Sequence, residues 1–182
     1  MVYILLGEGF EECEALVPAD LLRRAGAQVQ LVAVEEDLAV TGANGITVVA
    51  DISLQEASVE EMQMLILPGG MGGVESIRMN LFAVALITDA WEKGAYLGAI
   101  CAAPTLLANL SILDRRRAVC YPGMEDAMGS AVVQVGADVV EDGHIVTAQA
   151  AGSSFEFGFK LVEKLCGYTA MKKVRQDVYY KS

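Results

Sequence analysis

Short apolar runs alternate along the chain with segments in which apolar residues recur every three or four positions. Uninterrupted apolar runs bounded by Gly, Pro or polar residues are typical of buried strands, and the periodic segments are typical of helices that pack through one face. This pattern predicts strands at residues 2–6, 28–34, 45–50, 64–67, 96–100, 118–121, 132–135, 139–140 and 145–148.

Helices are predicted over residues 13–25, 81–93 and 153–165, and a further helix begins near Pro104. Proline is well tolerated in the first turn of a helix, and Ser153 to Glu156 has the spacing of an amino-terminal capping box. The dipeptide Asp142-Gly143 predicts a hairpin turn between the last two strands.

Strands that alternate with helices are typical of βαβ units, which place a parallel sheet between two layers of helices. The chain has 182 residues and no repeat, linker or low-complexity segment. We therefore expect a single domain over residues 1–182, of the α/β class, arranged as a three-layer αβα sandwich with a mostly parallel central sheet.

The charge balance narrows the range of partners. Thirteen Lys and Arg against 24 Asp and Glu give a net charge of −11, which would repel a nucleic-acid backbone. Apolar runs are too short to span a membrane, and the amino terminus carries no basic leader. We expect no nucleic acid or membrane as partner, and a cytoplasmic location.

The four cysteines, at positions 13, 101, 120 and 166, form no C-x-x-C pair, and His144 is the only histidine. Zinc sites need several Cys or His ligands at short spacing, so we expect no metal site. Disulfides are rare in a reducing cytosol, and each cysteine is therefore a packing residue or a reactive thiol. We expect Cys13 to be a packing residue.

Cys101 stands between a predicted strand and a predicted helix, within Gly98-Ala99-Ile100-Cys101-Ala102-Ala103-Pro104. Small residues on both sides suit a strained strand-to-helix turn, and the end of a parallel strand is where ligands bind. A thiol at the start of a helix is expected to have a lowered pKa, which favours the nucleophilic thiolate. The alternative is that Cys101 only packs in the core.

Two further segments should meet Cys101 at this edge of the sheet. Gly69 and Gly70 follow a strand, and their N–H groups, with that of Ala102, could hold a developing oxyanion; the alternative is a simple turn. Glu14 lies one helical turn into the first helix, where burial would raise its pKa and keep it protonated, so that it could donate a hydrogen bond to the thiolate or shuttle a proton. Glu11 and Glu12 would serve the helix dipole.

The motifs Gly-Phe-Glu-Glu-Cys-Glu at 9–14, Leu-Pro-Gly-Gly at 67–70, Ala-Ile-Cys-Ala-Ala-Pro at 99–104 and Gly-Ser-Ser-Phe-Glu-Phe at 152–157 together resemble the ThiJ/PfpI superfamily. Within it the chain most resembles the branch of the Parkinsonism-associated deglycase- and glyoxalase-like proteins. This resemblance implies a flavodoxin-like fold, a homodimer, Cys101 as the nucleophile and Glu14 as its protonated partner. Peptidase members carry a histidine directly after the nucleophile, where this chain has Ala102.

Three positions depart from the pattern of that branch. Tyr121, ahead of Pro122, stands where members of that branch often have a histidine. Asn44 and Gln149 replace arginines that often line the pocket. With Glu11 and Cys13, these are the predicted pocket residues. We expect a pocket less cationic than is usual in the family.

The first functional hypothesis is a cofactor-independent glyoxalase or deglycase that acts on small 2-oxoaldehydes such as methylglyoxal, or on their adducts. The alternative is a redox-sensing or chaperone-like homodimer in which Cys101 is oxidised. A third hypothesis, an amidotransferase-like hydrolase, needs a catalytic histidine, and His144 is expected in an exposed hairpin turn.

Overall fold

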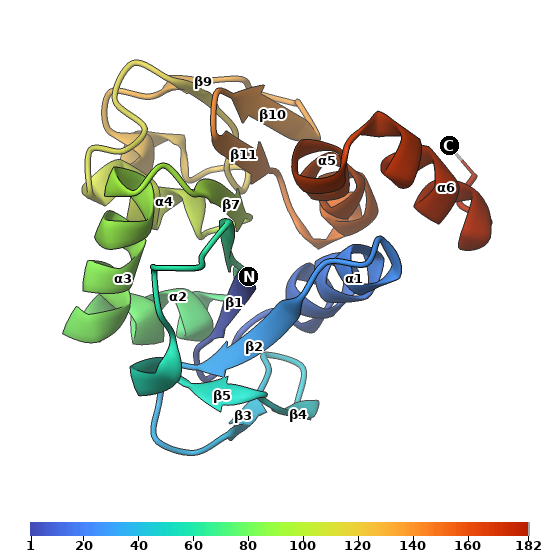
Figure 1. The fold of residues 1–182 in the computed structure, drawn as a ribbon. Coiled ribbons are helices and arrows are strands. Elements are labelled where there is room, and N and C mark those ends of the chain that lie inside the picture. The colour runs from blue at the N-terminus through green and yellow to red at the C-terminus, as the bar shows by residue number, and fades with distance from the viewer. Residues whose placement is uncertain (182) are drawn as a thin grey trace.

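The computed structural model describes residues 1–181, which form a seven-stranded sheet between two layers of helices (Figure 1). The strand order is β10-β11-β7-β6-β1-β2-β5, and only the β10–β11 pair is antiparallel. The strands are β1 Val2–Leu6, β2 Val29–Ala33, β5 Ile52–Ser53, β6 Met64–Leu67, β7 Tyr96–Ile100, β10 Val139–Asp142 and β11 Ile145–Ala148.

Alternate residues of the central strand β1 face opposite helix layers. Tyr3 and Leu5 belong to the apolar core shared with α3 and α4, whereas Ile4 and Leu6 pack in the core shared with α1 and α5. The helices are α1 Glu12–Arg24, α2 Met71–Met79, α3 Leu81–Glu92, α4 Pro104–Asn109, α5 Ser154–Cys166 and α6 Tyr168–Asp177. The expected α/β sandwich is therefore confirmed.

Two small sheets stand apart from the main one. Strands β3 Ala39–Thr41 and β4 Thr47–Val49 form an antiparallel hairpin, and β8 Arg117–Ala118 pairs with β9 Val132–Val133. The predicted strand at 118–121 is therefore wrong beyond Ala118, because the following segment turns toward Cys101 instead of continuing a ladder. The predicted Asp142-Gly143 hairpin between β10 and β11 is confirmed.

Two helices, α2 and α6, were not predicted from the sequence. The helix α2 starts with Met71-Gly72-Gly73, and glycine is unfavourable in a helix, so the sequence did not indicate it. Glycine is nevertheless required at position 73, because a Cβ atom there would lie 2.8 Å from Phe10 Cα. The helix α6 buries only Val174 fully, while Ala170 and Met171 pack partly against the core. Three short 3-10 turns, Leu54–Glu56, Glu125–Met128 and Ala151–Ser153, complete the structure.

The predicted capping box at Ser153–Glu156 is also wrong. The Ser153 side chain makes no cap hydrogen bond, because the preceding residues form a 3-10 turn that runs straight into α5. A capping box is found instead at Ser53 and Glu56. No helix within residues 1–181 combines the length and the apolar composition that crossing a membrane would require.

Candidate active site

Cys101 occupies a strained turn directly after β7. Its φ angle is +66°, a left-handed conformation that costs a non-glycine residue about 1–3 kcal/mol. The Cys101 N–H donates to Ala148 O at 2.9 Å, and its carbonyl accepts the Tyr121 N–H at 2.8 Å. The predicted strained elbow is thus present, and hydrogen bonds to two distant segments hold it in place.

Glu14 lies in the first turn of α1, and its side chain is completely buried. Its Oε2 accepts the Gly69 N–H at 2.7 Å, while the Glu14 carboxyl and the Cys101 thiol hydrogen-bond to each other. Glu14 Oε1 has no nitrogen or oxygen partner among the described residues. Helix α1 therefore brings the carboxyl to the sulfur, as the sequence predicted.

The backbone around the sulfur partly corrects the predicted oxyanion hole. The N–H groups of Gly70 and Ala102 both hydrogen-bond to the Cys101 sulfur. The Gly69 N–H, however, is already bound to Glu14 and is not free to stabilise an oxyanion. Gly70 has a φ of +84°, a conformation that glycine adopts without strain.

Burial is the largest influence on both ionisable groups of the pair. Burial raises the pKa of Glu14 to about 7, although the Gly69 N–H opposes this rise. Burial, followed by the charge and hydrogen bond of Glu14, raises the pKa of Cys101 to about 12, against the N–H groups of Ala102 and Gly70. Near neutral pH the pair therefore holds between one and two protons.

The expected lowering of the Cys101 pKa by the following helix is wrong. Helix α4 has only six residues and starts at Pro104, so its dipole is weak at the sulfur. A second negative charge beside ionised Glu14 is strongly disfavoured in a buried site. The thiolate therefore forms when Glu14 keeps the remaining proton, and the protonated carboxyl then donates a hydrogen bond to the sulfur.

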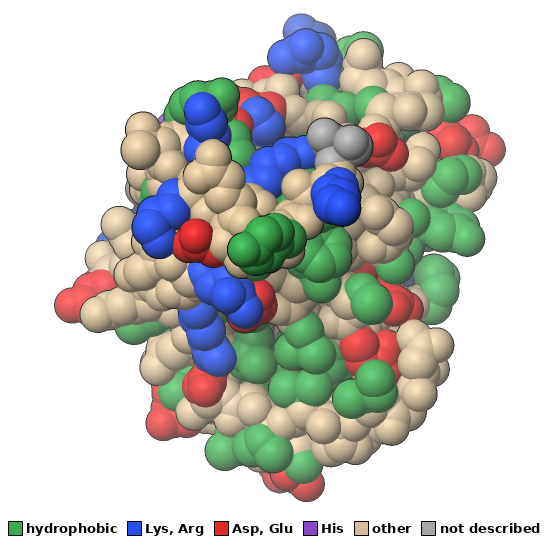
Figure 2. Space-filling view, turned by 90° about the vertical axis from the view of Figure 1, so that its right-hand side faces the viewer, with side chains coloured by type: hydrophobic (Ala, Val, Ile, Leu, Met, Phe, Trp, Pro, Cys, Tyr) green, Lys and Arg blue, Asp and Glu red, His purple; other side chains and the backbone are tan. Residues whose placement is uncertain are grey.

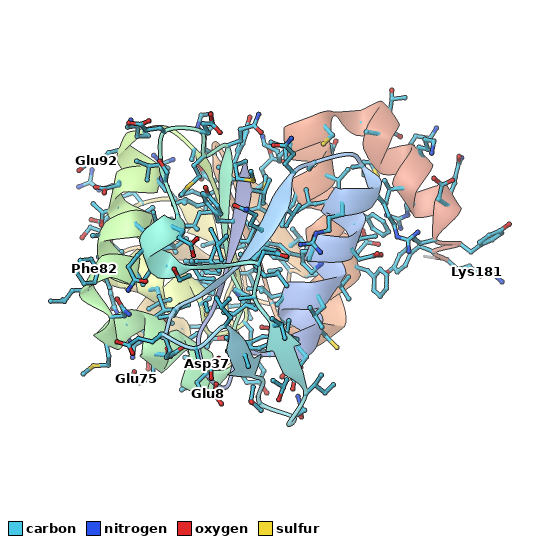
Figure 3. All side chains as sticks on the ribbon, turned by 60° about the horizontal axis from the view of Figure 1, so that its bottom comes forward. Glu8, Asp37, Glu75, Phe82, Glu92 and Lys181 are labelled. Atoms are coloured by element: carbon cyan, nitrogen blue, oxygen red, sulfur yellow. The ribbon has the colours of Figure 1, made fainter. Side chains whose placement is uncertain are left out.

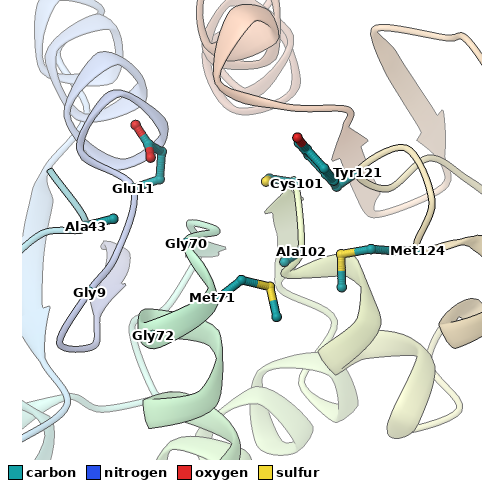
Figure 4. A pocket seen from close by; sticks show the side chains of 10 residues that line it. All are labelled: Gly9, Glu11, Ala43, Gly70, Met71, Gly72, Cys101, Ala102, Tyr121 and Met124. Carbon is teal, nitrogen blue, oxygen red and sulfur yellow. The ribbon is translucent and has the colours of Figure 1, made fainter.

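Cys101 opens onto a pocket of about 500 Å³ at the carboxyl edge of the sheet. Figure 4 shows Glu11 and Ala43 on one side, Cys101 and Tyr121 on the other, and Met71 between them. Ten residues line the pocket: Gly9, Glu11, Ala43, Gly70, Met71, Gly72, Cys101, Ala102, Tyr121 and Met124.

The predicted pocket residues divide into two groups. Glu11 and Tyr121 line the pocket, whereas Cys13, Asn44 and Gln149 do not. The Cys13 side chain is exposed and not a packing residue, because it lies on the solvent side of α1. Asn44 instead donates to the carboxylates beside it, and the Gln149 N–H donates to Asp138 O.

Glu12 has a structural role that sequence reasoning missed. Its buried carboxylate accepts the Asn44 N–H at 2.8 Å, the Asn44 Nδ2 at 2.8 Å and the Ile46 N–H at 3.3 Å. These hydrogen bonds lower the pKa of Glu12 although burial opposes them. Glu12 thereby fixes the 42–46 turn, which carries Ala43 into the pocket wall.

His144 lies at the opposite end of the sheet from Cys101. It is exposed in the β10–β11 turn, its ring is 4.7 Å from that of Tyr96, and its carbonyl accepts the Leu97 N–H. Tyr96 begins β7, whereas Cys101 follows its end, a separation of about 15 Å along an extended strand. A Cys101–His144 dyad is excluded, and with it the amidotransferase-like mechanism.

The comparisons with known proteins agree with this geometry. A model of the DJ-1/PfpI family matches residues 1–164. The chain belongs to the DJ-1/PfpI family. This assignment confirms the resemblance found in the sequence motifs, and it accounts for the flavodoxin-like arrangement of the sheet.

Relatives within the family cover almost the whole chain. Protein dj-1beta of Drosophila melanogaster is 30% identical over 96% of this chain and 94% of its own length. A protein of Pyrococcus abyssi named a deglycase is 34% identical over 90% of this chain and 98% of its own length. The structure of oxidized Toxoplasma gondii DJ-1 has a TM-score of 0.94 at 31% identity, covering 100% of this chain and 98% of that one.

Within residues 1–181, no group of three or more His, Cys, Asp and Glu side chains is arranged to hold a metal ion. Around the Cys101 sulfur the structure places a carboxyl group and two backbone N–H donors. Such a set can form and break a covalent bond to an electrophilic carbon while moving a proton.

Proposed function

We propose that the protein is a cofactor-independent glyoxalase- or deglycase-type enzyme that acts on small 2-oxoaldehydes or their adducts. The observation that carries this proposal is the pair formed by Cys101, which lines an open pocket, and the buried Glu14 hydrogen-bonded to it. A carboxyl whose pKa is near 7 exchanges protons readily at neutral pH, which is what a general acid–base catalyst needs. Relatives named deglycases support the same reaction class.

The first step joins the sulfur to the aldehyde carbon. The S–C bond forms as the C=O bond opens, and Glu14 relays the thiol proton to the aldehyde oxygen, which gives a hemithioacetal. The N–H groups of Gly70 and Ala102 face the sulfur and would stabilise the oxygen that becomes negative beside it.

The second step is an internal redox reaction that needs no external oxidant. Glu14, now ionised, removes the proton from the former aldehyde carbon and returns it to the neighbouring carbonyl carbon through an enediolate. The first carbon is thereby oxidised to a thioester and the second is reduced to an alcohol. Water hydrolyses the thioester, which releases a 2-hydroxy acid and regenerates the thiol.

A lactate assay tests this proposal. Purified protein with methylglyoxal and no glutathione should form lactate, and Cys101→Ser should form none. Glu14→Gln should lower kcat by at least about 100-fold, since it keeps the shape but cannot shuttle a proton. Turnover by the unsubstituted protein no faster than by Cys101→Ser would refute the enzymatic proposal.

Oxidation sensing is the second candidate, because the same two N–H groups that face the sulfur could hold the oxygens of an oxidised cysteine. Peptide mass analysis after mild peroxide discriminates between the candidates. A sensor should gain oxygen at Cys101 before the exposed Cys13, whereas an enzyme that is not a sensor should be oxidised first at Cys13.

We also propose that the protein forms a homodimer. The β3–β4 hairpin exposes 55% of Ile46 and 70% of Val49, and large apolar side chains exposed on one short hairpin would be covered in an interface. Light scattering should report twice the chain mass, and Val49→Glu should halve it. A monomer at micromolar concentration would contradict this proposal.

A further inference from the structure

Glu11 is the only carboxylate among the residues that line the pocket, and no Lys, Arg or His lines it. Its side chain lies across the pocket from Cys101 (Figure 4). The Asn44 amide, at 3.3 and 3.4 Å, donates to this carboxylate, and no salt bridge involves Glu11 within the described residues. The negative charge of Glu11 therefore acts on the pocket without a cation to neutralise it.

The fold places most of its cations away from this edge. Each helix that follows a strand runs back toward the amino edge of the sheet, and cations concentrate at the carboxyl ends of helices. Arg23 and Arg24 are in the last turn of α1, Lys93 ends α3, and Lys164 is in the last turn of α5. Figure 2 shows Lys and Arg over the upper and middle parts of the face formed by α1, α5 and α6, and not over its lower part.

Acidic residues gather at the carboxyl edge instead. Four acidic residues follow β1, namely Glu8, Glu11, Glu12 and Glu14, and three follow β2, namely Glu35, Glu36 and Asp37. In Figure 3, Glu8 and Asp37 lie together at one end of the molecule, whereas Glu92 lies at the opposite end of α3. Arg78 contacts α4, the helix that follows Cys101, through a 3.4 Å hydrogen bond to Thr105 Oγ1. The charge of Arg78 is already paired with Glu75 at 2.9 Å.

The remaining pocket wall is apolar. Met71 and Met124 supply flexible thioether side chains, Tyr121 an aromatic ring, and Ala43 and Ala102 methyl groups. Methionine adapts its shape to varied apolar groups, and an aromatic ring adds contact area. An uncharged substrate with an apolar substituent can bury that substituent here, whereas a carboxylate or phosphate would lose its water shell and face Glu11.

We propose that Glu11 is a specificity-determining residue that excludes anionic substrates, and that the pocket takes uncharged 2-oxoaldehydes with an apolar substituent. This inference rests on the proposed function for its substrate class. The exclusion of anions by Glu11, however, is a property of the pocket that can be measured without any turnover.

The enzymatic test uses a matched pair of substrates, phenylglyoxal and 4-carboxyphenylglyoxal, which differ by one carboxylate. The kcat/KM for phenylglyoxal should exceed that for 4-carboxyphenylglyoxal by on the order of tenfold, the size expected for two like charges several ångströms apart at a partly solvated site. Glu11→Gln should narrow this ratio and Glu11→Lys should invert it. Glu92→Gln removes the same charge far from the pocket and should leave the ratio unchanged.

The second test labels the thiol and does not depend on catalysis. Cys101 is treated with 2-aminoethyl methanethiosulfonate, a cation, and separately with 2-sulfonatoethyl methanethiosulfonate, an anion. Peptide mass analysis gives the rate at which each reagent modifies Cys101. Each rate is divided by the rate of the same reagent with 2-mercaptoethanol, which corrects for the intrinsic reactivity of the reagent. The cation should react on the order of tenfold faster than the anion, and Glu11→Gln should reduce this preference. Added salt should also reduce the preference for the cation, because dissolved ions screen exposed charges.

The outcomes separate the two proposals. Equal labelling by both reagents, unchanged in Glu11→Gln, would overturn the exclusion of anions by Glu11. Cation preference without turnover of either glyoxal would uphold the exclusion and refute the proposed enzyme. A Cys101 that neither reagent labels would be sealed from ligands, and both proposals would then be wrong.

Discussion

Glu14 and Cys101 flank the same backbone atom, the Cα of Gly69. A methyl group added to that atom would lie 2.5 Å from Glu14 Oε2 and 2.7 Å from Cys101 Cβ. Glycine is therefore required between the two groups, since any side chain at position 69 would push the carboxyl away from the sulfur.

Gly69→Ala should consequently separate the pair. We expect the substitution to reduce the free energy of unfolding by about 1–3 kcal/mol, as overpacking does, and to abolish turnover. Gly152→Ala is the matched control, because a methyl group there would meet nothing within 4 Å. Denaturant unfolding and the lactate assay measure both effects; equal stability of the two variants would contradict the close approach.

Glu14→Gln should lower the pKa of Cys101 from about 12. The glutamine removes a negative charge that raises the thiol pKa, and it leaves the N–H groups of Ala102 and Gly70 in place to stabilise the thiolate. The pH dependence of the Cys101 labelling rate reports this pKa directly. An unchanged or higher thiol pKa in the variant would show that the charge of Glu14 is not what suppresses ionisation.

The same carboxyl should make stability depend on pH. The pKa of Glu14 is about 7 in the folded protein against 4.5 ordinarily, so its contribution is fully present below 4.5 and is lost as pH rises through 7. The free energy of unfolding of the unsubstituted protein, minus that of Glu14→Gln at the same pH, should therefore fall by about 2 kcal/mol between about pH 5.5 and 8.5. Urea unfolding across this range checks the sign: a relative gain with rising pH would contradict a buried, protonated Glu14.

The strained backbone at Cys101 predicts an unusual order of stabilities. Cys101→Gly should be more stable than Cys101→Ala by about 1 kcal/mol, because glycine adopts a positive φ without steric cost. At the neighbouring Ala102, which lacks a positive φ, substitution by glycine should instead destabilise the protein. Thermal unfolding of the three variants tests the strain independently of any activity.

Much of the fold could be predicted from the sequence, because the buried strands β1, β6 and β7 are runs without a charged or strongly polar residue. Helix α2 could not, since its leading glycines are unfavourable for helix until Phe10 packs against them. Helix α6 is also hard to detect, because its apolar face is short: Val174 is its one fully buried residue, and Ala170 and Met171 are only partly buried beside it.

The candidate site was predictable in position but not in its electrostatics. Cys101 and Glu14 follow strands that end at one edge, so their meeting could be inferred from topology. The raised pKa of Cys101 could not, because it arises from burial and from a charge supplied by another element. Glu12 was missed for a similar reason: its partner Asn44 lies 32 residues further along the chain.

The two hydrogen bonds that hold the Cys101 backbone also bear on how the protein is made. The Ala148 carbonyl that accepts the Cys101 N–H belongs to β11, which is added to a growing chain long after the cysteine. During synthesis the elbow therefore has no acceptor until residue 148 of 182 has left the ribosome. The left-handed turn at Cys101 therefore gains this hydrogen bond only once the β7–β11 ladder has closed.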